Sequence, residues 1–394
     1  MLRPTLTSWL LCGLLASSAH GSPELPGTDE RGSEAQLVKS LQAINDNRLD
    51  IALNEVDSLL SINPNFKLAQ LVKGDLLMAR AGAIDNFGSA SNAPHDQIDD
   101  LRDEARIRLQ RVLSPSDTSL TPRFLWKLDA GQKYALVVDT SRATLFVYQN
   151  VNGEPRYVTD FYVTIGKLGT EKISEGDQRT PLGVYFVKAD LPKSQLADMY
   201  GSGAYPLSYP NEWDRKNNHS GSGIWLHGTP SDTYSRPPRA SNGCVVLANE
   251  DLKKLASYLQ VGITPVIITN RMDWNTEQDE RERDALLQEV EQWRKDWASL
   301  DTNAYLVHYA SDFSSDGMDY QSWAKKKQMA NNAKSWIKVS ISNLSVFTYP
   351  EQPELVVISF EQDYSSSNLS NRMKKRQYWI RKNDRWQIVY EGAA

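Results

Sequence analysis

Apolar residues recur every three or four positions through the first third of the chain, from about residue 34 to 113. One such run contains Ile51, Val56 and Leu60, and Pro64 interrupts it. This period is that of an amphipathic helix with one apolar face. Two prolines among small polar residues at 114–123 are typical of a linker. The pattern predicts a helical domain and linker over 34–125.

After this linker the periodicity becomes that of short strands separated by Gly and Pro turns. Strands are expected at 134–139, 144–148, 157–165, 182–187, 224–226 and 264–269. Many short strands of this kind, with few helical runs between them, favour a β-rich domain. We predict that this domain covers 126–272.

The last third of the chain begins with a highly charged segment at 273–300. Its apolar residues Leu286, Val290 and Trp293 form one stripe, which predicts a single amphipathic connecting helix. In 301–394 a helical piece precedes strands expected at 338–347, 355–364, 376–381 and 386–390. The fold class expected for the whole chain is therefore multi-domain α+β: helical, then β-rich, then α+β.

The N-terminus has the features of a secretory signal. Arg3 is followed by the apolar run 6–15, and small residues at 19–21 offer a cleavage site. We expect a signal peptide at 1–21 and a flexible leader at 22–33. The apolar run is shorter than the roughly 20 residues that span a bilayer, so a soluble mature protein is expected. The net charge of -5, without a long basic run, argues against nucleic-acid binding.

Export changes the cysteine count. Cys12 lies inside the predicted signal peptide, so Cys244 would be the only cysteine of the mature chain. A lone thiol has no intramolecular disulfide partner. It is either a buried inert residue or a reactive one, and its sequence neighbours decide between these.

Those neighbours favour catalysis. Cys244 ends a polar stretch that follows a proline-rich loop, and the strand 224–226 leads directly into a histidine. A thiol on a loop facing a histidine at a strand end is the arrangement of a cysteine nucleophile and its base. The residues that make up this candidate site are His227, Gly228, Ser241, Asn242, Gly243 and Cys244.

The order of these motifs resembles the YkuD-type L,D-transpeptidase family of bacterial peptidoglycan enzymes, over about 133–269. The resemblance rests on the strand at 136–139, the run 180–185 (TPLGVY), His227-Gly228 and the stretch 241–244 (SNGC). It implies a β-sandwich-like catalytic domain with Cys244 as nucleophile and His227 as base. It also implies that Ser241 and Gly243 shape the loop and that the Gly243 and Cys244 amides hold an oxyanion. No metal or other cofactor is implied.

Two positions depart from the commonest pattern of that family. The residue before Gly243 is usually His and here is Asn242, and the position two after the cysteine is often Arg and here is Val246. Arg236 and Arg239 could replace the missing arginine as carboxylate partners, or could belong to a solvated loop. Trp225 is expected in the core.

The resemblance implies that the thiol cleaves the bond between an L-diamino acid and D-alanine in a peptidoglycan stem tetrapeptide. The acceptor would be an amine from a second stem or an envelope protein, and the enzyme would act in the periplasm. Water as acceptor would make it an L,D-carboxypeptidase that trims tetrapeptides. A wall-binding scaffold without catalysis is a third alternative.

The order of the three parts is similar to that of L,D-carboxypeptidases that shape helical bacteria, in which the tail is a SnoaL-like domain. We therefore expect a SnoaL-like α+β cone over 301–394, serving as a docking module or a means of forming a homodimer. The helical region also resembles one weak tetratricopeptide unit, and a plain helical hairpin is an equal alternative.

Overall fold

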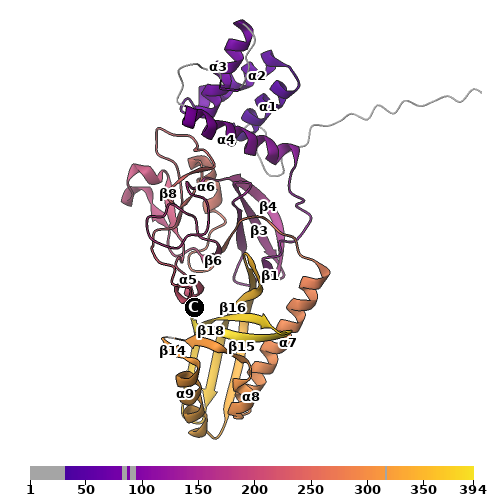
Figure 1. Ribbon diagram of the computed structural model, residues 1–394, viewed down its shortest axis with the longest axis vertical. Helices are drawn as coiled ribbons and strands as arrows, with labels where there is room; N and C mark the ends of the chain where they lie inside the picture. The colour runs from indigo at the N-terminus through magenta and orange to yellow at the C-terminus, as the bar shows by residue number, and fades with distance from the viewer. Residues whose placement is uncertain (1–31, 82–86, 89–94, 316) are drawn as a thin grey trace, which may run out of the picture.

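The computed structural model describes residues 32–81, 87–88, 95–315 and 317–394. The predicted signal peptide, Cys12 and nearly all of the predicted leader lie outside these residues. Figure 1 shows three bodies stacked along the long axis: helices at the top, a β-rich middle and a strongly curved sheet with its helices below. This arrangement confirms the expected fold class.

The N-terminal body consists of helices that pack as hairpins. They are α1 (Ser33–Asn45), α2 (Leu49–Ile62), α3 (Lys67–Ala81) and α4 (His95–Leu113). The apolar positions that predicted them, among them Leu53, Val56 and Leu59, are buried together with Phe66 in one core. α4 lies on the side of this body that faces the middle body (Figure 1), and Tyr234 of the middle body packs against the same core.

The middle body has two main sheets. One has the order β4-β3-β2-β12-β6, and the other has the order β11-β9-β8-β7. Side chains of both, such as Leu136 and Leu226, meet in one apolar core between the sheets. The strands are β2 (Tyr134–Asp139), β3 (Thr144–Val151), β4 (Glu154–Tyr162), β6 (Gly183–Phe186), β7 (Leu191–Pro192), β8 (Gly203–Pro206), β9 (Trp225–His227), β11 (Val245–Val246) and β12 (Pro265–Thr269).

Short elements complete this body around the loops. β5 (Ile165–Gly166) pairs in parallel with β10 (Arg239–Ser241). The remaining pieces are the single-turn helices η1 (Lys193–Gln195) and η2 (Asp198–Tyr200) with α5 (Glu212–Lys216) and α6 (Asn249–Ala256).

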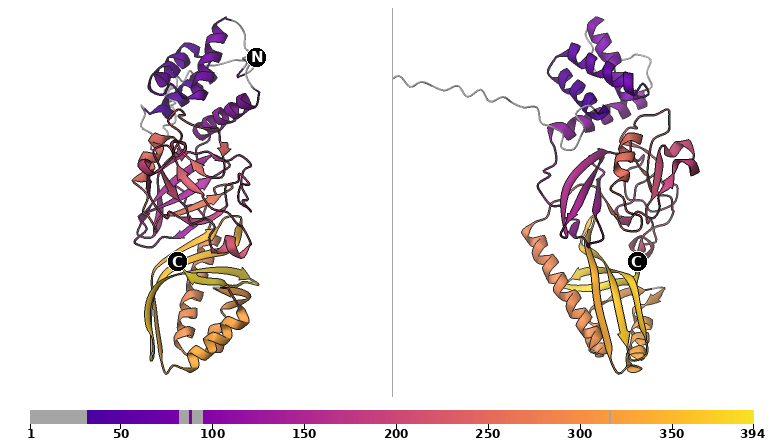
Figure 2. Two further views of the ribbon diagram at one scale, coloured as in Figure 1. Left: turned by 90° about the vertical axis from the view of Figure 1, so that its left-hand side faces the viewer. Right: turned by 180° about the vertical axis from the view of Figure 1, so that it is seen from behind.

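The C-terminal body is a sheet of order β1-β15-β16-β17-β18-β13-β14 that curves around three helices, as Figure 2 shows. The predicted connecting helix is α7 (Glu277–Ala298), whose start is fixed by reciprocal hydrogen bonds between Thr276 and Asp279. The other elements are α8 (Thr302–Leu306), β13 (Tyr309–Ser315), β14 (Met318–Asp319), α9 (Tyr320–Asn332), β15 (Ile337–Tyr349), β16 (Gln352–Ser366), β17 (Ser370–Lys382) and β18 (Arg385–Ala393).

The middle and C-terminal bodies share structure. β1 (Leu125–Lys127) precedes the middle body in the sequence but pairs with β15 of the C-terminal sheet. A common apolar cluster includes Val137 and Phe186 from the middle body and Phe347 and Tyr378 from the C-terminal sheet. Burial of such side chains supplies the main attraction between the two bodies. None of the helices in the described ranges has the length and apolarity needed to cross a membrane.

Candidate active site

Neighbouring strands bring Cys244 and His227 into one region of the smaller sheet. β11 runs parallel to β9, with Val245 opposite Leu226 and Val246 opposite His227. Val245 and Leu226 point into the core between the sheets. Because alternate residues of a strand point to opposite faces, His227 points away from that core. Cys244 lies in the turn directly before β11, and its Sγ contacts the Gly223 carbonyl just before β9.

The turn before Cys244 is held by hydroxyl groups. The buried Ser241 Oγ donates to the carbonyl oxygen of Cys244 at 2.6 Å. Thr180 Oγ1 donates to the Gly243 carbonyl at 2.9 Å and accepts from the Gly166 amide at the same distance. Ser241 therefore has the loop-shaping position that the resemblance implied. Thr180, which the sequence analysis used only as part of a motif, fixes the same turn from the other side.

Gly243 is required by conformation and by space. Its φ is +122°, a region that favours glycine, and a Cβ there would lie 2.7 Å from the Arg179 carbonyl oxygen. Its amide, however, donates to Ser241 Oγ at 3.1 Å. This corrects the expectation that the Gly243 amide is an oxyanion donor, because that N–H is already used to close the turn. The Cys244 amide remains the predicted donor.

His227 is buried, and its tautomer leaves Nε2 free to accept a proton. Its Nδ1 lies 2.7 Å from the Gly228 carbonyl oxygen, an acceptor only, so Nδ1 carries the proton and the Nε2 lone pair is left for a substrate or thiol proton. The ring of Tyr200 packs edge-on at 5.2 Å. Burial, opposed by the Gly228 hydrogen bond, lowers the pKa of His227 to about 4. The imidazole is therefore neutral at pH 7.

The thiol is also neutral in this state. Cys244 Sγ donates its one hydrogen to the Gly223 carbonyl at 3.2 Å. Burial raises the pKa of Cys244, while a hydrogen bond from the Trp225 amide and the charges of Arg236 and Lys172 oppose that rise. His227 and Cys244 are therefore both uncharged in this arrangement. His227 would act by accepting the thiol proton during attack.

Gly228 holds the loop after His227 close to helix α6. A Cβ at Gly228 would lie 2.1 Å from Asn249 Oδ1, so only glycine fits. Asn249 accepts from the Ser202 amide at 2.8 Å and donates to the Thr229 carbonyl at 2.8 Å. Asn249 thus joins the two loops that flank the histidine.

The remaining predicted residues differ in exposure. Arg236 is half-buried, and its charge acts on the Cys244 thiol. Arg239 and Asn242 are exposed. Trp225 was expected in the core, and this was wrong: it is half-buried, and its ring is tilted against that of Tyr200 with 4.8 Å between the ring centres.

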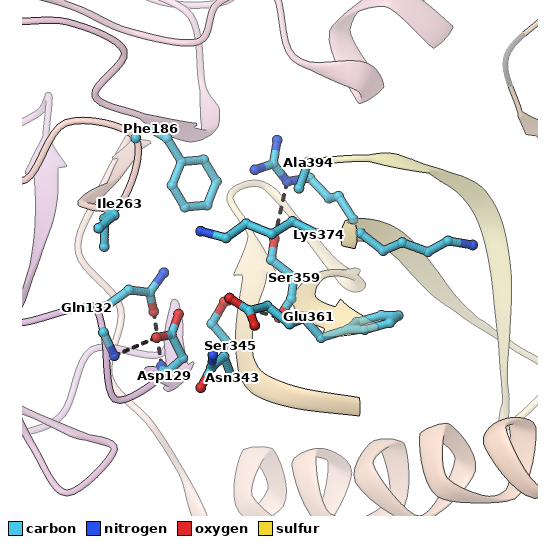
Figure 3. Close-up of a pocket in the computed structure, with 15 residues that line it drawn as sticks. Asp129, Gln132, Phe186, Ile263, Asn343, Ser345, Ser359, Glu361, Lys374 and Ala394 are labelled. Atoms are coloured by element: carbon cyan, nitrogen blue, oxygen red, sulfur yellow. Dashed lines mark hydrogen bonds between the residues drawn. The ribbon is translucent and has the colours of Figure 1, made fainter. Parts of the chain in front are cut away.

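A separate cavity of about 150 Å³ lies between the middle and C-terminal bodies. Figure 3 shows its walls, with Phe186 and Gln132 on one side and Lys374, Glu361 and Ser359 on the other. None of the predicted site residues lines it. This cavity is therefore distinct from the Cys244 site.

Two families account for most of the described chain. Residues 133–268 match the L,D-transpeptidase catalytic domain, YkuD, and residues 285–392 match the Cds6 C-terminal NTF2-like domain. The chain therefore joins a YkuD-type L,D-transpeptidase catalytic domain to a C-terminal NTF2-like (SnoaL-like) domain, as its sequence motifs indicated. No curated protein matches it.

Solved structures share this layout. Bd1075 of Bdellovibrio bacteriovorus is 28% identical, with a TM-score of 0.61 over 70% of this chain and 98% of that one. The helical cell shape determining protein Pgp2 of Campylobacter jejuni is 26% identical, with a TM-score of 0.59 over 70% of this chain and 96% of Pgp2. Since nearly the whole of each relative is covered, the similarity extends over more than the catalytic domain.

Proposed function

We propose that this protein is a periplasmic cysteine acyltransferase that acts on peptidoglycan stem tetrapeptides. The observation that carries the proposal is that two paired strands of a YkuD-type domain hold Cys244 and His227: Cys244 directly precedes β11 and His227 ends β9. The loop geometry of Ser241 and Gly243 supports it. Two hydroxyl hydrogen bonds and the positive φ of Gly243 fix the backbone of the turn that carries the thiol.

In the proposed reaction Cys244 Sγ attacks the carbonyl carbon of the L-diamino acid, and its proton passes to His227 Nε2. The Cys244 amide stabilises the oxyanion. The C–N bond to D-alanine then breaks, and the leaving amine takes the proton from His227. A thioester on Cys244 remains, together with free D-alanine. Arg236 is the proposed partner of the terminal carboxylate, because its guanidinium acts on the thiol.

The second substrate distinguishes the candidate activities. An amine from another stem or from an envelope protein would release the thioester as a new amide, which is L,D-transpeptidation. Water would release it as a carboxylate, which is L,D-carboxypeptidation. The likeness to Pgp2, a helical cell shape determining protein, favours the second activity and a role in cell shape, because it includes the C-terminal domain.

The test is incubation of the purified protein with tetrapeptide muropeptides, with and without an amine acceptor, followed by D-alanine assay and mass spectrometry. Wild type should release D-alanine, and Cys244→Ala should not. His227→Gln should lower the rate by about 10²- to 10⁴-fold, the usual contribution of a general base.

The product masses identify the acceptor. A tripeptide indicates hydrolysis, and a product heavier by the added amine indicates transfer. Release of D-alanine by Cys244→Ala would refute the assigned nucleophile. If wild type releases none under either condition, the acyltransferase proposal fails and a wall-binding scaffold becomes the better description.

A further inference from the structure

The loop at 229–238, between His227 and Cys244 in the sequence, contacts the N-terminal helices as well as the catalytic sheet. Ser235 Oγ donates to Glu104 Oε1 of α4 at 2.7 Å, and both side chains are buried. The ring of Tyr234 packs 4.5 Å from that of Phe66, which is fully buried in the N-terminal core. Two adjacent loop residues are thus held by a different domain.

The next residue in this loop is Arg236, whose main chain is held from the other side. Its carbonyl oxygen accepts from Tyr162 Oη and from Thr164 Oγ1, both at 3.0 Å. Thr164 in turn exchanges backbone hydrogen bonds with Val246, two residues beyond the thiol. Arg236 therefore directly follows Ser235, which contacts the N-terminal domain. Its carbonyl is bonded to Thr164, whose backbone pairs with Val246 close to Cys244.

The N-terminal side of this junction is rigid. Glu104 accepts two hydrogen bonds from Arg108 one helical turn later, at 2.9 and 3.1 Å, and both side chains are almost fully buried. The Arg108 guanidinium also lies 3.8 Å from the centre of the Tyr162 ring. Ion pairs of Glu34 with Arg108 and of Arg111 with Asp160 surround it. A buried network of this kind has one low-energy arrangement, because leaving any of its charges unpaired is costly.

We propose that the N-terminal helical domain is part of the active site's anion-recognition apparatus: Glu104 and Phe66 are positioning residues that hold Tyr234 and Ser235, and through them the adjacent Arg236, whose carbonyl is fixed to the strands next to Cys244. The class of ligand is a carboxylate-bearing acyl donor. This inference deepens the proposed function and rests on it for the identity of the donor. The placement of a cation beside the thiol does not depend on peptidoglycan chemistry and can be tested without it.

The first test measures alkylation of Cys244 by iodoacetate, an anion, and by iodoacetamide, which is neutral. A positive charge near the thiol raises the rate with iodoacetate relative to the rate with iodoacetamide. Both reagents react with the thiolate, so a change in the fraction of thiolate cancels in the ratio of the two rates. Arg236→Gln should lower the ratio roughly fivefold, the effect of one charge at about 4 Å in a watery setting. Ser235→Ala and Tyr234→Leu should each lower it toward the value of Arg236→Gln.

Ser231→Ala is the matched control. It removes a hydroxyl from the same loop, but that hydroxyl bonds to Asp198 of the catalytic domain at 3.1 Å. Its ratio should equal that of wild type. Glu104→Gln keeps an oxygen acceptor for Ser235 and should retain most of the ratio, which distinguishes positioning from a general loss of structure.

The second test compares tetrapeptides that end in a carboxylate and in an amide. Ser235→Ala should raise KM for the carboxylate substrate and leave KM for the amide nearly unchanged, whereas a general structural defect would affect both. A wild-type alkylation ratio in both Ser235→Ala and Tyr234→Leu overturns the inference. If the ratio falls as expected but no tetrapeptide is cleaved, the proposed function fails while the positioning of Arg236 stands.

Discussion

At the scale of single residues, the site depends on two glycines as much as on His227 and Cys244. Gly243 and Gly228 each occupy a place that a Cβ would overlap, against Arg179 and Asn249 respectively. His227 and Cys244 are each neutral because burial disfavours their charged forms. The proposed catalytic pair is therefore uncharged at rest, and packing rather than an ion pair holds the two groups in place.

Gly243→Ala should lower both the stability of the protein and its catalytic rate. The positive φ and the contact with the Arg179 carbonyl should cost about 1–3 kcal/mol, and displacement of the turn should lower kcat by about 10²-fold. Steady-state kinetics and thermal unfolding measure the two effects. Gly262→Ala is the control, since Gly262 also has a positive φ but open space around it. Equal loss of activity in both variants would contradict this account of the turn.

At the scale of elements, short strands and helix ends place the functional groups. β9 and β11 are only three and two residues long, yet their parallel register decides which side chains share a face. In the C-terminal domain His308, which lies just after α8, binds two carboxylates of α7. Its two ring nitrogens lie 2.7 Å from Glu289 and 2.8 Å from Asp296, both on α7.

This histidine predicts a pH dependence of stability. Burial disfavours the imidazolium, but the hydrogen bonds and charges of Glu289 and Asp296 outweigh it, so the pKa of His308 is raised in the folded state. The stabilisation is therefore fully present below the unfolded pKa of about 6.5 and is lost as pH rises through the folded pKa. His308→Gln should destabilise the protein by about 1–3 kcal/mol at pH 6 and by less at pH 9.

Thermal unfolding at the two pH values, with His219→Gln as a control outside α7, checks this prediction. A loss that is greater at pH 9 than at pH 6 would show that the sign is wrong.

At the scale of the whole molecule, the catalytic domain is held between two others. Below it, Arg376 of β17 pairs with Glu212 of α5 at 3.1 Å, and its guanidinium lies 4.4 Å from the centre of the Phe186 ring. Tyr378 Oη donates to the same carboxylate at 3.0 Å. With the shared apolar cluster, these contacts join the NTF2-like domain to the catalytic domain.

Arg376→Ala should loosen this junction. It removes the nearer cation of the largely buried Glu212 carboxylate and leaves it only the more distant Arg215 at 3.9 Å, which should cost up to about 3–5 kcal/mol. Limited proteolysis should then cut between the domains faster, and the thermal midpoint should fall. Arg372→Ala on the same strand removes a solvent-screened pair with Glu361 and should change the thermal midpoint little. Similar behaviour of the two variants would mean that the Glu212 contact contributes little.

The sequence by itself determined much of this molecule. The helical period at 34–113, the short strands after residue 126 and the stripe of α7 are local patterns, because each element must turn an apolar face to a core. The stretch 241–244 and His227 were proposed as a site for a different reason: their order along the chain resembles that of the YkuD family. That order is also a property of the sequence, so the proposal needed no fold.

Only the tertiary structure decided what surrounds the thiol. The use of the Gly243 amide within its own turn, the exposure of Trp225 beside Cys244 and the link from Glu104 to Ser235 join groups by hydrogen bonds and packing that no period encodes. Glu104 and Ser235 are 131 positions apart. Burial also set the protonation of His227 and Cys244, since desolvation depends on everything packed around a group and not on its place in the chain.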